Sequence, residues 1–307
     1  MLRKPTCLAS LAAVACGLLL ASCQKFSGSQ TVPAYIHIDS ISLDCDYYTY
    51  GANTCKFTDA WVYVDDQITG CYELPATIPI LKHGKHKVSV YGGIKVNGIS
   101  AARSPYPFCK PKIYEELDLV EDSIINLQPV LNYYAVEVLS TGWKEDFEQG
   151  STLVATSQSD TSIMRIGGSE AWRVDSVHSF YSGKVVLPGD SLHFTVANSD
   201  ELTDLPTDGS YCMLEMDYKS NDTFTVGVMY MEDYTITQWP LVTITPTDTQ
   251  HAIPQSWNKI YINIGPTLVA HEDASYYKIY LTSHTDNDLP ASFTRYFYFD
   301  NLKLLYR

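Results

Sequence analysis

Positive charge is scarce in this sequence of 307 residues. Lysine and arginine together number 21, against 35 aspartates and glutamates, and the formal net charge is −14. Nucleic acids and anionic lipid surfaces are themselves negatively charged and attract basic proteins. The composition therefore argues against both as partners.

Runs of helix-favouring residues are also scarce. Thr, Val, Ile and the 23 tyrosines recur at alternate positions instead. Alternation with a period of two is typical of β-strands that bury one face. This alternation predicts an all-β globular protein. The sequence shows no internal repeat, coiled-coil pattern or low-complexity tract.

Motifs of the common catalytic classes are missing. The sequence has no Gly-x-Ser-x-Gly elbow, no phosphate-binding glycine loop and no dinucleotide fingerprint. His271-Glu272 begins like a zinc-protease motif, but Ser275 stands where the second histidine is needed. Paired acids are abundant, yet sequence cannot show which of them face each other. We predict that the protein is not an enzyme.

Long apolar runs are missing after the first twenty residues. Arg3 and Lys4 precede an apolar run, Cys7–Leu20, which is shorter than the roughly 20 residues that span a bilayer. This order of charge and apolar residues is typical of a secretory signal. The end of the run, Leu20-Ala21-Ser22-Cys23, resembles the lipobox of bacterial lipoproteins. The resemblance implies cleavage before Cys23, acylation of its thiol and attachment to the outer membrane of the cell envelope.

Export bears on the remaining cysteines, since an oxidising envelope permits disulfides. Zinc is disfavoured, because no Cys-x-x-Cys pair exists among Cys45, Cys55, Cys71 and Cys109. Cys45 and Cys55 bracket a tyrosine-rich loop, which favours a disulfide between them, although three pairings are formally possible. Cys212 lies in an apolar strand pattern, where we expect a buried, unreactive thiol.

The length of the chain predicts more than one domain. Without the signal peptide (1–22), about 285 residues remain, a size that usually forms two domains. Residues 23–32 are polar and suit a flexible tether. From about residue 132 the predicted strands form a longer series with few proline-rich turns, which places the two domains at 33–131 and 132–307.

The first of these domains carries a recognisable pattern. Val62-x-Val64-Asp65, Gly70 and Leu74-Pro75 precede the alternating segment Leu81–Val90. This order resembles the small immunoglobulin-like sandwiches of the PEGA and carboxypeptidase-regulatory type. The resemblance implies an immunoglobulin-like β-sandwich with a structural or spacer role.

The second domain begins and ends on characteristic segments. Phe147-Glu148-Gln149-Gly150 lies near its start, Trp257–Ile262 forms a late strand pattern, and Tyr298-Phe299-Asp300-Asn301 lies near its end. This order resembles carbohydrate-binding modules of the galactose-binding-like jelly-roll type. The resemblance implies a β-jelly roll that binds glycan.

Jelly rolls of this type bring their first and last strands together, which would place Glu148 near Asp300. Two neighbouring carboxylates repel each other unless a cation lies between them. The sequence thus predicts a structural calcium ion held by Glu148 and Asp300. In the alternative, Glu148 caps a turn and Asp300 pairs with Lys303 or Arg295.

Aromatic side chains are the natural platforms for sugar rings, whose C–H faces stack on flat π-systems. Trp239 lies in a stretch that reads as a loop and is the preferred ligand-binding candidate, together with Tyr234 and Tyr230. The tryptophans inside strand patterns are expected in the core. These are Trp61, Trp172 and Trp257.

Three functions follow, in order of preference. The first is a non-enzymatic envelope lipoprotein whose jelly roll binds glycan or another surface polymer. The second is a structural lipoprotein that binds a protein partner in an outer-membrane transport or secretion complex. The third is an envelope hydrolase with an unrecognised site.

Overall fold

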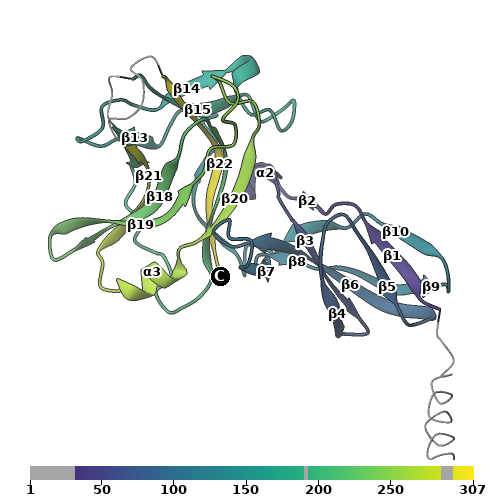
Figure 1. Ribbon diagram of the computed structural model, residues 1–307. Helices are drawn as coiled ribbons and strands as arrows, with labels where there is room; N and C mark the ends of the chain where they lie inside the picture. Colours follow the sequence, from purple (N-terminus) through teal and green to yellow (C-terminus); the bar gives the residue numbers. More distant parts are fainter. Residues whose placement is uncertain (1–31, 190–192, 285–292) are drawn as a thin grey trace, which may run out of the picture.

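The computed structural model describes residues 32–189, 193–284 and 293–307 (Figure 1). The lipobox and its Cys23 lie outside these residues. Within them the chain forms two β-sandwiches, side by side, with only short helices between strands. The predicted all-β class, a β-sandwich followed by a jelly roll, is confirmed. No helix in the described part of the chain is long and apolar enough to cross a membrane.

The N-terminal sandwich packs one large sheet against two small ones. The large sheet has the order β4-β3-β6-β7, with β9 also paired to β6, and the small sheets have the orders β10-β1-β5 and β2-β11-β8. The elements are β1 (Ala34–Ile38), β2 (Ser42–Asp44), α2 (Tyr47–Tyr50), β3 (Asp59–Val64), β4 (Gln67–Glu73), β5 (Ala76–Ile80), β6 (Gly84–Lys95), β7 (Arg103–Pro105), β8 (Cys109–Lys110), β9 (Lys112–Leu119), β10 (Ile124–Leu127) and β11 (Val130–Tyr133).

The C-terminal sandwich packs two larger sheets. The inner sheet has the order β14-β15-β22-β17-β20, with β12 also paired to β22, and the outer sheet has the order β13-β16-β21-β18-β19. The elements are β12 (Ser140–Glu145), β13 (Leu153–Ala155), β14 (Met164–Gly167), η2 (Gly168–Glu170), β15 (Tyr181–Leu187), β16 (His193–Asn198), β17 (Cys212–Ser220), β18 (Phe224–Glu232), β19 (Thr235–Ile244), β20 (Asn258–Asn263), α3 (Gly265–Ala270), β21 (Tyr276–His284) and β22 (Arg295–Tyr306).

Alternation explains the buried faces. In β1, Ala34, Ile36 and Ile38 are fully buried, while the residues between them are partly exposed. Successive side chains of a strand point to opposite faces, so each alternating segment presents one apolar face to a core. In the C-terminal sandwich that core is rich in phenylalanine, and the rings of Phe194 and Phe297 lie 4.9 Å apart.

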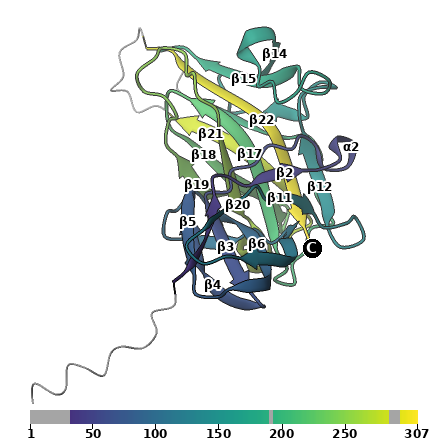
Figure 2. The same ribbon diagram turned by 90° about the vertical axis from the view of Figure 1, so that its right-hand side faces the viewer.

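Strand β17 of the inner sheet is buried on both faces, which positions the site described below. Along β17, Leu214 and Met216 join the C-terminal core, whereas Glu215 and Asp217 belong to the opposite face. All nine residues of β17 are buried all the same. The N-terminal sandwich and its loops cover this second face (Figure 2).

The two sandwiches share core residues. Met213, Tyr261 and Leu305 of the C-terminal sandwich pack in the N-terminal core. The predicted boundary after residue 131 falls inside β11, which pairs with β2 and β8. The N-terminal sheets therefore extend to Tyr133, and the division into independent domains stays a prediction.

Candidate functional site

Tyrosines pack the N-terminal sandwich against the face of the inner sheet that points away from the C-terminal core. The Tyr261 ring lies 5.0 Å from that of Tyr106, and its hydroxyl accepts a hydrogen bond from the Lys56 backbone amide at 2.9 Å. The Tyr261 carbonyl in turn accepts from the backbone amide of Asn97 at 2.8 Å. Aromatic packing and backbone hydrogen bonds thus hold the two sandwiches in one arrangement.

A buried group of charges lies at the centre of this contact. Glu215 is 1% exposed and lies between two lysines, with its Oε2 2.8 Å from Lys259 Nζ and 3.7 Å from Lys303 Nζ. Its Oε1 accepts hydrogen bonds from the hydroxyls of Tyr106 and Tyr133. Both tyrosines come from the N-terminal sandwich, so one carboxylate of the C-terminal sandwich ties the two together.

Burial and charge oppose each other at Glu215. Burial alone would raise its pKa, but the ammonium groups of Lys259 and Lys303 outweigh burial and lower the pKa to about 2. Burial likewise opposes the charge of Lys259, yet Asp217 and Glu215 raise the pKa of that lysine. The carboxyl groups of Glu215 and Asp217 thus lie together with the amino groups of Lys259 and Lys303 in one buried cluster.

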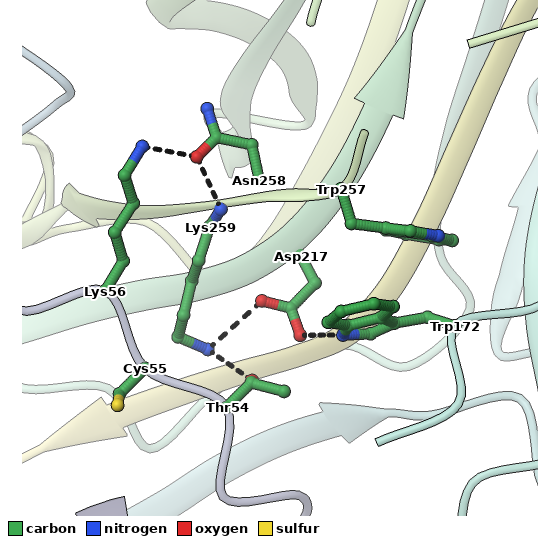
Figure 3. Close-up of a pocket in the computed structure, with 8 residues that line it drawn as sticks. All are labelled: Thr54, Cys55, Lys56, Trp172, Asp217, Trp257, Asn258 and Lys259. Carbon is green, nitrogen blue, oxygen red and sulfur yellow. Dashed lines mark hydrogen bonds and ion pairs between the residues drawn. The ribbon is translucent and has the colours of Figure 1, made fainter. Parts of the chain in front are cut away.

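An open pocket of about 340 Å³ adjoins this charge group (Figure 3). One wall is the segment Thr54–Lys56 of the N-terminal sandwich, and the other is formed by Trp172 and Trp257. Asp217 and Lys259 lie between the walls, and Lys259 Nζ donates to Thr54 Oγ1 at 3.0 Å. The volume lies within the 300–1,000 Å³ typical of small-molecule sites.

The two tryptophans stack on each other. Their ring centroids lie 5.6 Å apart with an interplanar angle of 25°. A sugar ring between them would need about twice the 3.5–4.0 Å contact distance of carbon atoms, so it does not fit there. A ligand would contact the outer surface of the pair. Trp172 Nε1 donates to Asp217 Oδ2 at 3.1 Å, which fixes the ring beside a carboxylate.

The prediction that these tryptophans are core residues is wrong. Neither lies in a strand, and both are partly exposed: Trp172 follows η2, and Trp257 directly precedes β20. The sequence holds a signal that we did not use, because turn-forming residues precede each tryptophan, Gly168-Ser169 in one case and Pro254-Gln255-Ser256 in the other. Trp61 lies in β3 but is also only partly buried.

The aromatic candidates from the sequence lie on the other sheet. Trp239 is 46% exposed and belongs to strand β19, not to a loop as predicted. Tyr234 is fully exposed at the turn between β18 and β19. Tyr230 is buried, with its ring stacked on His271 at 3.9 Å, so its prediction as a ligand platform is wrong.

The predicted disulfide between Cys45 and Cys55 is absent, because both residues are free thiols. Cys45 Sγ donates to the carbonyl of Gly51 at 3.5 Å, and Cys55 Sγ donates to that of Ile41 at 3.7 Å. The helical turn α2 lies between the two cysteines, and each thiol is directed to a different carbonyl. Cys212 is buried as predicted, and burial raises the pKa of its thiol.

The predicted calcium ligands each accept hydrogen bonds from protein groups. Glu148 Oε1 accepts from the backbone amides of Phe180 and Tyr181, at 2.7 and 2.9 Å. Asp300 accepts from the Ser182 hydroxyl at 2.6 Å, and burial raises its pKa well above the usual range. Among the described residues, no three His, Cys, Asp or Glu side chains form a group that could hold a metal ion. The calcium ion stays a prediction.

No family model matches the sequence, and neither does any curated protein. Similar folds occur among solved structures. The family 11 carbohydrate-binding module from Clostridium thermocellum, in complex with a β-1,3-1,4-mixed-linked tetrasaccharide, matches 54% of this chain and 94% of its own, with 15% identity and a TM-score of 0.36. TmCBM61 in complex with β-1,4-galactotriose matches 53% and 94%, with 14% identity and a TM-score of 0.31. The tailspike protein 4 of bacteriophage CBA120 matches 50% of this chain and 19% of its own, with 12% identity and a TM-score of 0.34.

Proposed function

We propose that the protein binds a glycan, without catalysis, in the pocket beside Trp172 and Trp257. The observation that carries the proposal is the stacked, partly exposed tryptophan pair in an open pocket with polar side chains. Flat aromatic rings accept the C–H face of a pyranose, and neighbouring polar groups exchange hydrogen bonds with its hydroxyls. The pocket combines both features.

The polar groups around the pair suit sugar hydroxyls. Asp217 supplies a carboxylate, Asn258 an amide and Thr54 a hydroxyl, and all three line the pocket. The Asn258 amide nitrogen donates to the Tyr218 hydroxyl at 2.9 Å, which holds the side chain in place. Binding groups that are already oriented lose less conformational entropy when a ligand arrives.

Substitution of Trp257 by alanine tests this function. We expect at least about tenfold weaker binding of any glycan that the protein recognises, because the stacking surface is lost. Isothermal titration against a panel of oligosaccharides measures the effect. Trp239→Ala is the matched control, since it removes a half-exposed tryptophan from the other sheet. Equal loss in both variants, or loss in Trp239→Ala alone, would place the ligand elsewhere.

We also propose that the chain is a lipoprotein attached through Cys23. The proposal is supported by the signal-like segment and the lipobox resemblance of Leu20–Cys23. Cys23→Ala is expected to yield a protein that leaves the detergent phase in Triton X-114 partitioning, because the acyl chains are absent. Continued partitioning of the variant into detergent would exclude acylation at this residue.

An envelope assembly role is the second candidate. It is supported by β19, the last strand of its sheet, which carries the exposed side chains of Ile236 and Trp239. An exposed apolar edge strand is a surface on which another chain can add a strand. Co-purification of an envelope protein that is lost in Trp239→Ala and kept in Trp257→Ala would favour this role.

A further inference from the structure

Lysines gather around the tryptophan pocket, although the chain as a whole is strongly acidic. Lys56 and Lys259 line the pocket, and Lys219 holds its ammonium 5.1 Å from the ring centroid of Trp257. Lys95 lines a second hollow of about 200 Å³ that shares Lys56, Asn258 and Lys259 with the first. The two hollows therefore adjoin and form one extended, lysine-lined cleft.

Some of these charges are balanced by neighbouring carboxylates. Lys259 lies near Asp217 and Glu215, with Nζ–O distances of 3.6 and 2.8 Å. Lys95 lies 3.3 Å from Glu73, which also pairs with Arg103. Neither lysine contributes a free positive charge to the cleft.

Lys56 is not balanced. Its ammonium donates to the side-chain oxygen of Asn258 (Figure 3), and it makes no ion pair with any residue that the structure describes. Burial of part of its side chain lowers the pKa of Lys56, and repulsion from Lys95 lowers it further. An anion in the cleft would relieve that repulsion.

Lys219 is the second unbalanced cation. The residue is only 7% exposed, and its ammonium lies over the rings of Trp257 and Tyr298, 5.1 and 4.4 Å from their centroids. The nearby Glu170 is already paired with Lys184 at 2.9 Å. Within the described ranges Lys219 takes part in no ion pair, which is unusual for a lysine this deeply buried.

We infer that the glycan is acidic, a polysaccharide whose carboxylate or sulfate groups are bound by Lys56, which lines the pocket, and by Lys219, whose ammonium lies over the Trp257 ring. The inference rests on the proposed function, because it assigns a substrate class to that site. A sugar that stacks on the pair would carry its acidic group toward one of two unpaired ammonium groups. Charge-assisted hydrogen bonds of this kind are about twice as strong as neutral ones.

Matched pairs of polymers test the inference. The probes are polygalacturonate with its methyl ester, alginate with its propylene glycol ester, and chondroitin sulfate with its desulfated form. We expect the acidic or sulfated member of at least one pair to bind at least about tenfold more tightly, with an affinity that falls as sodium chloride rises. Ester pairs report on carboxylates and the chondroitin pair on sulfate.

Three variants assign the charge preference to residues. Lys56→Gln and Lys219→Gln are each expected to weaken binding of the acidic or sulfated member about fivefold more than binding of its esterified or desulfated partner. Lys85→Gln is the matched control, because it removes the same charge from an exposed lysine paired with Glu116 in the N-terminal sandwich. Thermal melting of each variant confirms that it is folded.

The outcomes separate the two proposals. Equal binding of both members of every pair, or binding of neutral glycans alone, overturns the acidic ligand and leaves the glycan site standing. An acidic preference that survives both lysine substitutions overturns the assignment to Lys56 and Lys219. Failure of every glycan to bind the wild-type protein overturns both proposals.

Discussion

Glu215→Ala is expected to lower the free energy of unfolding by about 3–5 kcal/mol, the usual cost of removing one partner from a buried ion pair. The substitution leaves Lys259 and Lys303 buried with only Asp217 to offset their charges. It also removes the acceptor of two tyrosine hydroxyls. Urea unfolding followed by tryptophan fluorescence measures the change.

The control is Glu116→Ala, which removes a carboxylate from an exposed pair with Lys85. Such pairs contribute about 0–1 kcal/mol. A similar, small loss in both variants would mean that the charge group at Glu215 does not hold the two sandwiches together. A large loss at Glu215 alone supports the network, which adjoins the pocket because Lys259 both pairs with Glu215 and lines the pocket.

Acid is expected to weaken the folded state through the same carboxylate. The pKa of Glu215 is about 2 in the folded protein, against 4.5 for an unperturbed glutamate. Because its pKa is lower in the folded protein, the ionised Glu215 carboxylate stabilises the fold fully above pH 4.5. This contribution to the free energy of unfolding is lost as the pH falls from 4.5 through 2. The pKa difference corresponds to about 3 kcal/mol.

Glu215→Gln isolates this contribution, because glutamine does not titrate. The difference in unfolding free energy between wild type and variant should shrink by about 3 kcal/mol between pH 5 and pH 2. Urea unfolding at a series of pH values provides the measurement. A difference that stays constant over this range would show that Glu215 is not the carboxylate that links acid to unfolding.

The sequence by itself determined the class of fold. The alternation of Ala34, Ile36 and Ile38 requires a strand with one buried face, since side chains repeat every second residue. Burial of Cys212 followed in the same way from its apolar neighbours. These features depend on local periodicity, which is fully present in the chain.

Local pattern misled where a residue's surroundings come from distant segments. Trp172 and Trp257 are 85 positions apart in the sequence and stack only because both lie beside the outer face of β17 and β20. The sequence around Tyr230 does not reveal that its ring is buried, because the ring is covered by His271, which lies 41 positions further along the chain. Free and covered aromatic rings look alike in sequence.

Only the tertiary structure shows which charged side chains lie next to one another, and therefore where the site is. Glu215 stands in an apolar strand pattern, and its partners Lys259, Lys303 and Tyr106 come from three other segments. Lys95 and Lys259 make ion pairs with carboxylates, whereas Lys56 and Lys219 make none with any residue that the structure describes. Electrostatic balance depends on distances of a few ångströms between segments far apart in the chain, and the fold alone sets those distances.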